Sequence, residues 1–200
     1  MSPVEIKDAQ TGSVAKIAPE LGFNCYKFIA RLDGQAVDVI DAAPDFAEGK
    51  QSFSGHGIPI LFPYPNRIRG AKFTWDGREY FLPPGKVAYN KDNAIHGFCL
   101  HRPWKVTDQG ENFVTGEFQL SREAPDRRDL WPADFLLEVR YTLEGTVLQM
   151  AIRATNPDSV PLPWGFGTHA YFKLPLGANS SPAKCLLEAP ASQQWKLIDC

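Results

Sequence analysis

The run Phe-Leu-Leu-Glu-Val-Arg-Tyr-Thr-Leu-Glu-Gly-Thr-Val-Leu-Gln-Met-Ala-Ile-Arg-Ala-Thr, at residues 135–155, decides the fold class. Its first half places an apolar side chain at every second position from Leu137 to Leu143, with charged or polar side chains between them. A period of two is typical of a β-strand that has one buried and one solvated face. Glu144-Gly145 joins this strand to a second one over 147–155. The run therefore predicts two adjacent strands of an antiparallel sheet.

The rest of the chain repeats this theme of short strands separated by turns. Two turns are marked by Asp33-Gly34 and Asp76-Gly77, because both central positions of a tight hairpin turn need positive φ, which Gly and Asp tolerate. Further strands are predicted over 13–18, 23–32, 36–40, 71–75, 78–82, 104–107 and 113–120. No long stretch has helical periodicity. The predicted fold is an all-β antiparallel sandwich with long loops, in which function lies in loops and strand ends.

Four local features carry more detailed expectations. In the strand over 23–32, Phe23 and Cys25 are predicted to face the core, while Asn24 and Lys27 take outward or turn positions. After Pro83-Pro84-Gly85 we expect a surface loop through residue 92, since proline cannot donate to a strand ladder. A short helical turn or a loop is predicted over 43–51. The charged stretch 122–129 is predicted to be a short helix or an exposed loop.

Composition bounds the class of protein. The 200 residues suit one domain, 1–200, and the 44% hydrophobic and 22% charged content is that of a globular protein. A net charge of −2 and scattered basic residues argue against nucleic acid as a partner. The N-terminus lacks the apolar core of a signal peptide and no apolar run approaches a membrane span, so a soluble, cytoplasmic protein is expected. Its four cysteines show no metal-ligand spacing and are expected to be reduced thiols.

Two histidines stand out among four. His96 lies in Asn-Ala-Ile-His-Gly-Phe, and His169 lies in Gly-Phe-Gly-Thr-His-Ala-Tyr-Phe. Imidazole can give or take a proton near neutrality, glycine lets a ligand approach the backbone, and aromatic rings offer faces to a sugar. Either histidine alone could equally be a core residue satisfied by a backbone carbonyl. Finding both in such settings favours a shared site.

Arg67, preceded by Asn66, is the notable cation of the stretch Gly55 to Phe98. A guanidinium presents a planar fork of donors that suits vicinal hydroxyls or a carboxylate, and an amide both donates and accepts. Pairing of Arg67 with a carboxylate from another strand is the structural alternative. His56, His101 and Arg69 are interpreted as structural or solvated. The sequence shows no metal-ligand cluster, no glycine-rich phosphate loop and no G-x-S-x-G elbow, so neither a metal nor a cofactor is predicted.

Three blocks of the sequence, in order, resemble the aldose 1-epimerase (galactose mutarotase) family. The first is Leu-Phe-Pro-Tyr-Pro-Asn-Arg-Ile, which ends at residue 68; the second is Ile-His-Gly around His96; the third runs from Asn156-Pro157 to Thr-His-Ala-Tyr-Phe around His169. The resemblance implies a β-supersandwich that interconverts the α and β anomers of a free aldohexose, such as galactose or glucose, without a cofactor. It implies that Asn66 and Arg67 hold ring hydroxyls and that Tyr171 contacts the sugar. It further implies that His96 binds near the anomeric carbon and that His169 is the general acid.

The chain departs from this family after its third block. Family members carry a glutamate general base and a sugar-binding aspartate well beyond that block, whereas only 200 − 169 = 31 residues follow His169 here. Glu188 and Asp199 do not match those positions in context. We therefore expect either a fragment of a longer chain, with the base beyond Cys200, or a short member of the family that lacks the base. In both cases the sandwich is expected to be incomplete.

Three alternatives remain open from the sequence. A non-catalytic carbohydrate-binding or regulatory module would keep the sugar-contacting residues without the base. A hexose-6-phosphate mutarotase-like protein would need more basic residues at the site than the sequence offers. A β-sandwich without any ligand is the third possibility. Neither the preferred aldose nor the oligomeric state follows from the sequence.

Overall fold

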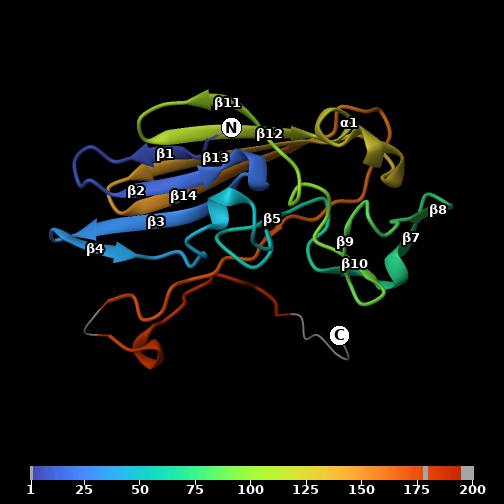
Figure 1. Cartoon of the computed structure of the whole chain (residues 1–200). Helices are drawn as coiled ribbons and strands as arrows, with labels where there is room; N and C mark the ends of the chain where they lie inside the picture. The colour runs from blue at the N-terminus through green and yellow to red at the C-terminus, as the bar shows by residue number, and fades with distance from the viewer. Residues whose placement is uncertain (1, 178–179, 195–200) are drawn as a thin grey trace.

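The computed structural model describes residues 2–177 and 180–194, and most of these residues lie in or between antiparallel strands (Figure 1). The first sheet has the order β1-β2-β3-β4, with β1 at Val4–Lys7, β2 at Val14–Ala18, β3 at Asn24–Leu32 and β4 at Gln35–Asp38. The second sheet has the order β11-β12-β13-β14, with β11 at Lys105–Gln109, β12 at Phe113–Gln119, β13 at Leu136–Glu144 and β14 at Val147–Thr155. Figure 1 shows these two sheets stacked on each other.

The smaller elements are grouped between and beside these sheets. Three short sheets pair β6 (Arg67–Ile68) and β9 (Ala88–Asn90) with β10 (Asn93–Ile95), β15 (Gly167–Thr168) with β5 (Ile60–Leu61), and β7 (Lys72–Trp75) with β8 (Arg78–Phe81). The one α-helix of the described residues is α1 (Leu120–Glu123). Short 3₁₀ helices occur at Pro19–Leu21, Phe46–Glu48, Arg69–Ala71, Pro125–Leu130 and Pro182–Lys184.

The core lies between the two large sheets and follows the predicted alternation. The apolar positions of β13, Leu137, Val139, Tyr141 and Leu143, are fully buried. The Phe23 ring stacks on Trp104 with a centroid separation of 5.3 Å. A Cβ atom at Gly116 would lie 2.5 Å from the Phe23 ring, so this strand position has to be glycine. The prediction of an antiparallel, mostly β fold is confirmed.

Both hairpin turns form as predicted. Asp33 and Gly34 have φ values of 48° and 78°, and Asp76 and Gly77 have φ values of 49° and 74°. These positive angles are those of the tight turns that match the twist of the flanking strands. The turns therefore fix the registers Leu32 to Gln35 and Trp75 to Arg78.

Four expectations need correction or refinement. The expected loop before residue 92 contains a hairpin, β9–β10, whose turn uses Lys91 at φ 54° and no glycine, so the usual turn signal is missing. Asn24 is fully buried instead of outward, because its side chain is covered by the loop over 56–58, where it donates to the carbonyl of His56 and accepts from the N–H of Ile58. The charged stretch 122–129 contains the end of α1 and most of the 3₁₀ helix Pro125–Leu130, separated by the non-helical Ala124, and Arg127 within it is buried. Strand β1 had no predicted counterpart.

Strand β14 is the edge of its sheet within the described chain. Its inward side chains Leu148 and Met150 are partly buried, whereas Ile152 is 42% exposed although its neighbour Val139 on β13 is fully buried. The core side of the sheet therefore opens toward the C-terminal end of β14.

Candidate functional site

The first half of the site is assembled by the pairing of β6 with β10. Arg67 lies opposite Ile95 in this ladder, and the backbone N–H of His96 donates to the carbonyl of Asn66 at 2.9 Å. Asn66 and His96 both adopt left-handed φ values, 59° and 65°. Such values are uncommon for residues other than glycine and concentrate at functional sites. Two segments about thirty residues apart in sequence thus present Asn66, Arg67 and His96 side by side.

The second half is brought in by β15. Thr168 pairs with Ile60 of β5, and the N–H of His169 donates to the carbonyl of Pro59 at 3.3 Å. Two residues later, the N–H of Tyr171 donates to the carbonyl of Gly57 at 2.9 Å. The stretch Pro59 to Leu61 precedes the Asn66-Arg67 turn directly, so this pairing carries His169 to the first half of the site.

Glycine lets these two halves pack closely. A Cβ at Gly167 would lie 2.8 Å from the Cβ of Pro65, and the N–H of Gly165 donates to the carbonyl of Pro63 at 2.7 Å. A Cβ at Gly97 would lie 2.0 Å from the carbonyl oxygen of Phe62. Gly97 therefore serves a backbone-to-backbone contact beside His96, and Gly167 leaves room for the Pro65 ring near His169, a close approach that glycine permits.

The two imidazoles face each other at this junction. The ring centroids of His96 and His169 lie 6.1 Å apart with an interplanar angle of 73°, and the Tyr171 ring stacks on His169 at 5.0 Å. His96 is partly buried and His169 is exposed. The structure thus gathers all five residues that the sequence singled out, Asn66, Arg67, His96, His169 and Tyr171. Their individual roles stay predictions.

Burial and neighbouring cations keep His96 uncharged. Desolvation, followed by the charges of His169, Arg67 and His101, lowers the pKa of His96 from 6.5 to about 4. None of these three neighbours is a carboxylate. At neutral pH the His96 ring is therefore a neutral imidazole that has one donor and one acceptor nitrogen.

Two polar atoms of the site have no hydrogen-bond partner within the described part of the chain. These are the Nδ1 of His96 and the Nε of Arg67, both buried. The Nη1 of Arg67 donates to the Oδ1 of Asn66 at 2.7 Å, so the amide orients the guanidinium. The predicted alternative, an Arg67 paired with a carboxylate from another strand, has no support among the ion pairs of the described residues. Buried polar groups without a partner are uncommon, and two of those among the described residues lie at this junction.

The other histidines and the cysteines lie outside this junction. The Nδ1 of His56 accepts from the N–H of Ala43 at 3.4 Å, and the His101 ring packs on Phe53 at 5.2 Å, both of which are structural contacts. Cys25, Cys99 and Cys185 are free thiols, and Cys200 and Asp199 lie outside the described residues. Glu188 is exposed.

The described residues contain no cluster of three potential metal ligands. No helix in this part of the chain is long and apolar enough to cross a membrane.

Sequence reasoning missed Asn24, which holds the approach to the site. Its Nδ2 donates to the carbonyl of His56 at 2.8 Å, and its Oδ1 accepts from the N–H of Ile58 at 2.8 Å. This buried amide fixes the loop that leads into β5. The sequence signal for this role was a polar residue that interrupts the apolar run at 23–25.

Trp164 is a second residue that only the structure reveals. Its side chain is 64% exposed, and its ring lies 6.2 Å from the Phe62 ring, so it offers an additional aromatic surface.

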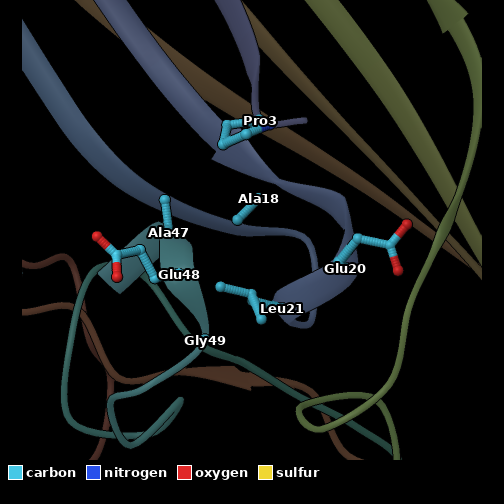
Figure 2. A pocket seen from close by; sticks show the side chains of 7 residues that line it. All are labelled: Pro3, Ala18, Glu20, Leu21, Ala47, Glu48 and Gly49. Carbon is cyan, nitrogen blue, oxygen red and sulfur yellow. The ribbon is translucent and has the colours of Figure 1, made fainter. Parts of the chain in front are cut away.

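A cavity of about 250 Å³ lies elsewhere, beside the first sheet, and does not share residues with the site. Figure 2 shows its lining, which is Pro3, Ala18, Glu20, Leu21, Ala47, Glu48 and Gly49. The carboxylates of Glu20 and Glu48 point away from each other. The arrangement provides no paired acids, so we assign no chemistry to this cavity.

Comparison with known proteins places this geometry in a family. Residues 30–200, most of the chain, match the family model described as aldose 1-epimerase. Galactose mutarotase of Rattus norvegicus is 31% identical over 144 residues, covering 70% of this chain and 39% of the rat protein. Galactose mutarotase of Mus musculus is 32% identical over 181 residues, covering 78% of this chain and 49% of the mouse protein.

Solved structures agree at the level of the fold. A galactose mutarotase-like protein from Clostridium acetobutylicum superposes with a TM-score of 0.73 at 24% identity, covering 88% of this chain and 53% of that one. An aldose epimerase homologue from C. elegans gives 0.68 at 23% identity, covering 86% and 51%. This chain thus spans about half the length of the proteins it matches. On its sequence and its fold, the chain belongs to the aldose 1-epimerase (galactose mutarotase) family.

Proposed function

We propose that the site interconverts the α and β anomers of a free aldohexose, such as galactose or glucose, by acid and base catalysis. The observation that carries this proposal is the facing pair His96 and His169, 6.1 Å apart between ring centroids, with Arg67 beside His96. A sugar ring needs hydrogen-bond partners for several hydroxyls and a proton donor at its ring oxygen. The neutral His96, the guanidinium of Arg67 and the exposed His169 supply these groups.

The reaction requires two proton transfers. A base removes the proton of the C1 hydroxyl while an acid protonates the ring oxygen. The bond between C1 and the ring oxygen then breaks, and the open chain carries an aldehyde. Rotation about C1–C2 followed by reclosure gives the other anomer, so atoms and electrons balance without a cofactor. In this proposal His169 is the acid, its ring held by Tyr171, and each positioned proton transfer contributes a factor of roughly 10² to 10⁴.

One observation favours a second candidate, a carbohydrate-binding module of the same fold that does no chemistry. The charges that act on His96 come from His169, Arg67 and His101, all of them potential cations, and the described residues bring no carboxylate to this group. A glutamate base of the kind that the family resemblance implies is thus not part of the described site. A chain without such a base would bind the sugar but leave its anomers unchanged.

Polarimetry on freshly dissolved α-galactose and α-glucose separates the two candidates. An anomerase accelerates mutarotation over buffer, and His169→Asn lowers the rate by roughly 10² or more. His56→Asn is the matched control, since the ring of this histidine contacts Ala43 and Phe46 and lies outside the pair, and it leaves the rate within about twofold. A rate equal to buffer, together with saturable galactose binding that Arg67→Met abolishes, supports the binding module. Absence of both rate and binding contradicts the site assignment.

A further inference from the structure

Arg127 is a buried cation without a carboxylate partner among the described residues. It lies in the 3₁₀ helix Pro125–Leu130 and its residue surface is only 7% exposed. The neighbouring Asp126 does not pair with it, because that carboxylate binds Arg102 at 2.7 Å and Lys86 at 2.9 Å. Burying an unpaired charge is costly, and an apolar side chain of similar length would avoid the cost. A purely structural role does not explain why this position carries a guanidinium.

The hydrogen bond of Arg127 goes to the loop that carries His96. Its Nη1 donates to the carbonyl of Phe98 at 3.0 Å, two residues after His96. The other main-chain bonds of this loop run to one segment: His96 N–H to the Asn66 carbonyl at 2.9 Å and Phe98 N–H to the Phe62 carbonyl at 2.8 Å. Arg127 therefore binds the loop from a second element, the 3₁₀ helix Pro125–Leu130, which supplies none of the candidate site residues.

The loop requires a second set of contacts, in addition to those with Phe62 and Asn66, because the backbone at His96 is strained. His96 and Gly97 follow each other with left-handed φ values of 65° and 79°. A residue other than glycine keeps this conformation only where contacts with the rest of the protein hold its backbone in place. The buried guanidinium meets this requirement, since a charged donor bonds a carbonyl more strongly than a neutral one.

We propose that Arg127 is a positioning residue that fixes the His96 imidazole in the site by binding the Phe98 carbonyl. The geometric part of this inference is independent of the reaction. Its consequence for sugar binding rests on the proposed function. Arg127 acts through the backbone and does not itself touch the sugar.

NMR of the full chain tests the proposal through Arg127→Met, with Arg122→Met as the matched control on an exposed arginine five residues earlier. We expect the pKa of His96 in Arg127→Met to rise from about 4 toward 6.5 by at least one pH unit, as the ring becomes more exposed. His169 and Arg67 face it unchanged, whereas the pKa of His101 is lowered partly by the charge of Arg127, so Arg127→Lys, which keeps that charge, is titrated alongside. We also expect hydrogen exchange at the Phe98 amide to accelerate at least tenfold, and neither change in the control.

A folded Arg127→Met protein with unchanged His96 titration and unchanged Phe98 exchange would overturn the proposal. If Arg127→Met does not fold, Arg127→Lys decides, because lysine keeps the charge but lacks the planar fork. A smaller shift of the same sign then supports the proposal, and wild-type behaviour overturns it. Galactose titration is run alongside. A shifted His96 in a chain that binds no galactose, wild type included, contradicts the proposed function and leaves the positioning role standing.

Discussion

Replacing Gly97 by alanine tests whether backbone contact, not only backbone conformation, holds the site together. Gly97 and Gly77 both have left-handed φ values, 79° and 74°, so both substitutions carry the left-handed strain of an L-residue, about 1–2 kcal/mol. The two positions differ in their surroundings. A Cβ at Gly77 meets nothing within 4 Å, whereas a Cβ at Gly97 meets the Phe62 carbonyl oxygen at 2.0 Å and the Pro63 nitrogen at 2.9 Å.

The additional cost at Gly97 follows from what must move. Real Cβ contacts essentially never fall below 3.0 Å, so one backbone must shift away from the other. Such a shift breaks the bond from the Phe98 N–H to the Phe62 carbonyl, 2.8 Å long in the wild type. Leaving these buried groups unpaired costs about 1–3 kcal/mol. We therefore expect Gly77→Ala to lower the free energy of unfolding by about 1–2 kcal/mol and Gly97→Ala to lower it by about 2–5 kcal/mol.

Urea unfolding followed by tryptophan fluorescence measures both variants against the wild type. Because the left-handed strain is common to the pair, the difference between the two values isolates the contact with Phe62. A Gly97→Ala protein no less stable than Gly77→Ala would refute the reasoning, since it would show that the loop accommodates a Cβ without losing its hold on Phe62.

Three further outcomes are expected. Asn24→Ala should lower the free energy of unfolding by about 1–3 kcal/mol, since it leaves the Ile58 N–H without its buried acceptor. Thermal or urea unfolding measures this, and a loss below about 1 kcal/mol would contradict it. His96 is neutral in the folded protein down to about pH 4, whereas the same side chain in the unfolded chain is protonated below about pH 6.5. The free energy of unfolding should therefore fall as the pH drops from 6.5 to 4, by at most about 3 kcal/mol. His96→Gln should make the free energy of unfolding less dependent on pH in this range. Burial raises the pKa of Asp134, but hydrogen bonds from Ser121 and other donors outweigh this effect and lower the pKa. The ionised carboxylate should therefore stabilise the folded protein above its unfolded pKa of 3.8, and this stability should be lost as the pH falls further. Asp134→Asn should remove this loss of stability in acid, and an unchanged pH dependence below 3.8 would contradict the assignment.

Local patterns were sufficient where neighbours in sequence are neighbours in space. The alternation from Leu137 to Leu143 predicted β13 because each strand residue reports its own face of the sheet. Asp33-Gly34 and Asp76-Gly77 predicted their turns because the required backbone angles belong to those residues themselves. The β9–β10 hairpin was missed because its turn depends on Lys91, a residue without a strong turn preference.

The sequence by itself determined the β class, the hairpins at Asp33-Gly34 and Asp76-Gly77, and the identity of five polar or aromatic residues at the candidate site. Only the tertiary structure decided that His96 and His169 meet, because their meeting depends on the pairing of β5 with β15. These two strands are more than a hundred residues apart, and the local sequence pattern of a strand does not specify which strand it pairs with. The same holds for the buried Asn24 and Arg127. Burial of a polar side chain is set by what packs against it, and for these two residues the partners are the carbonyls of His56 and Phe98, supplied by distant loops.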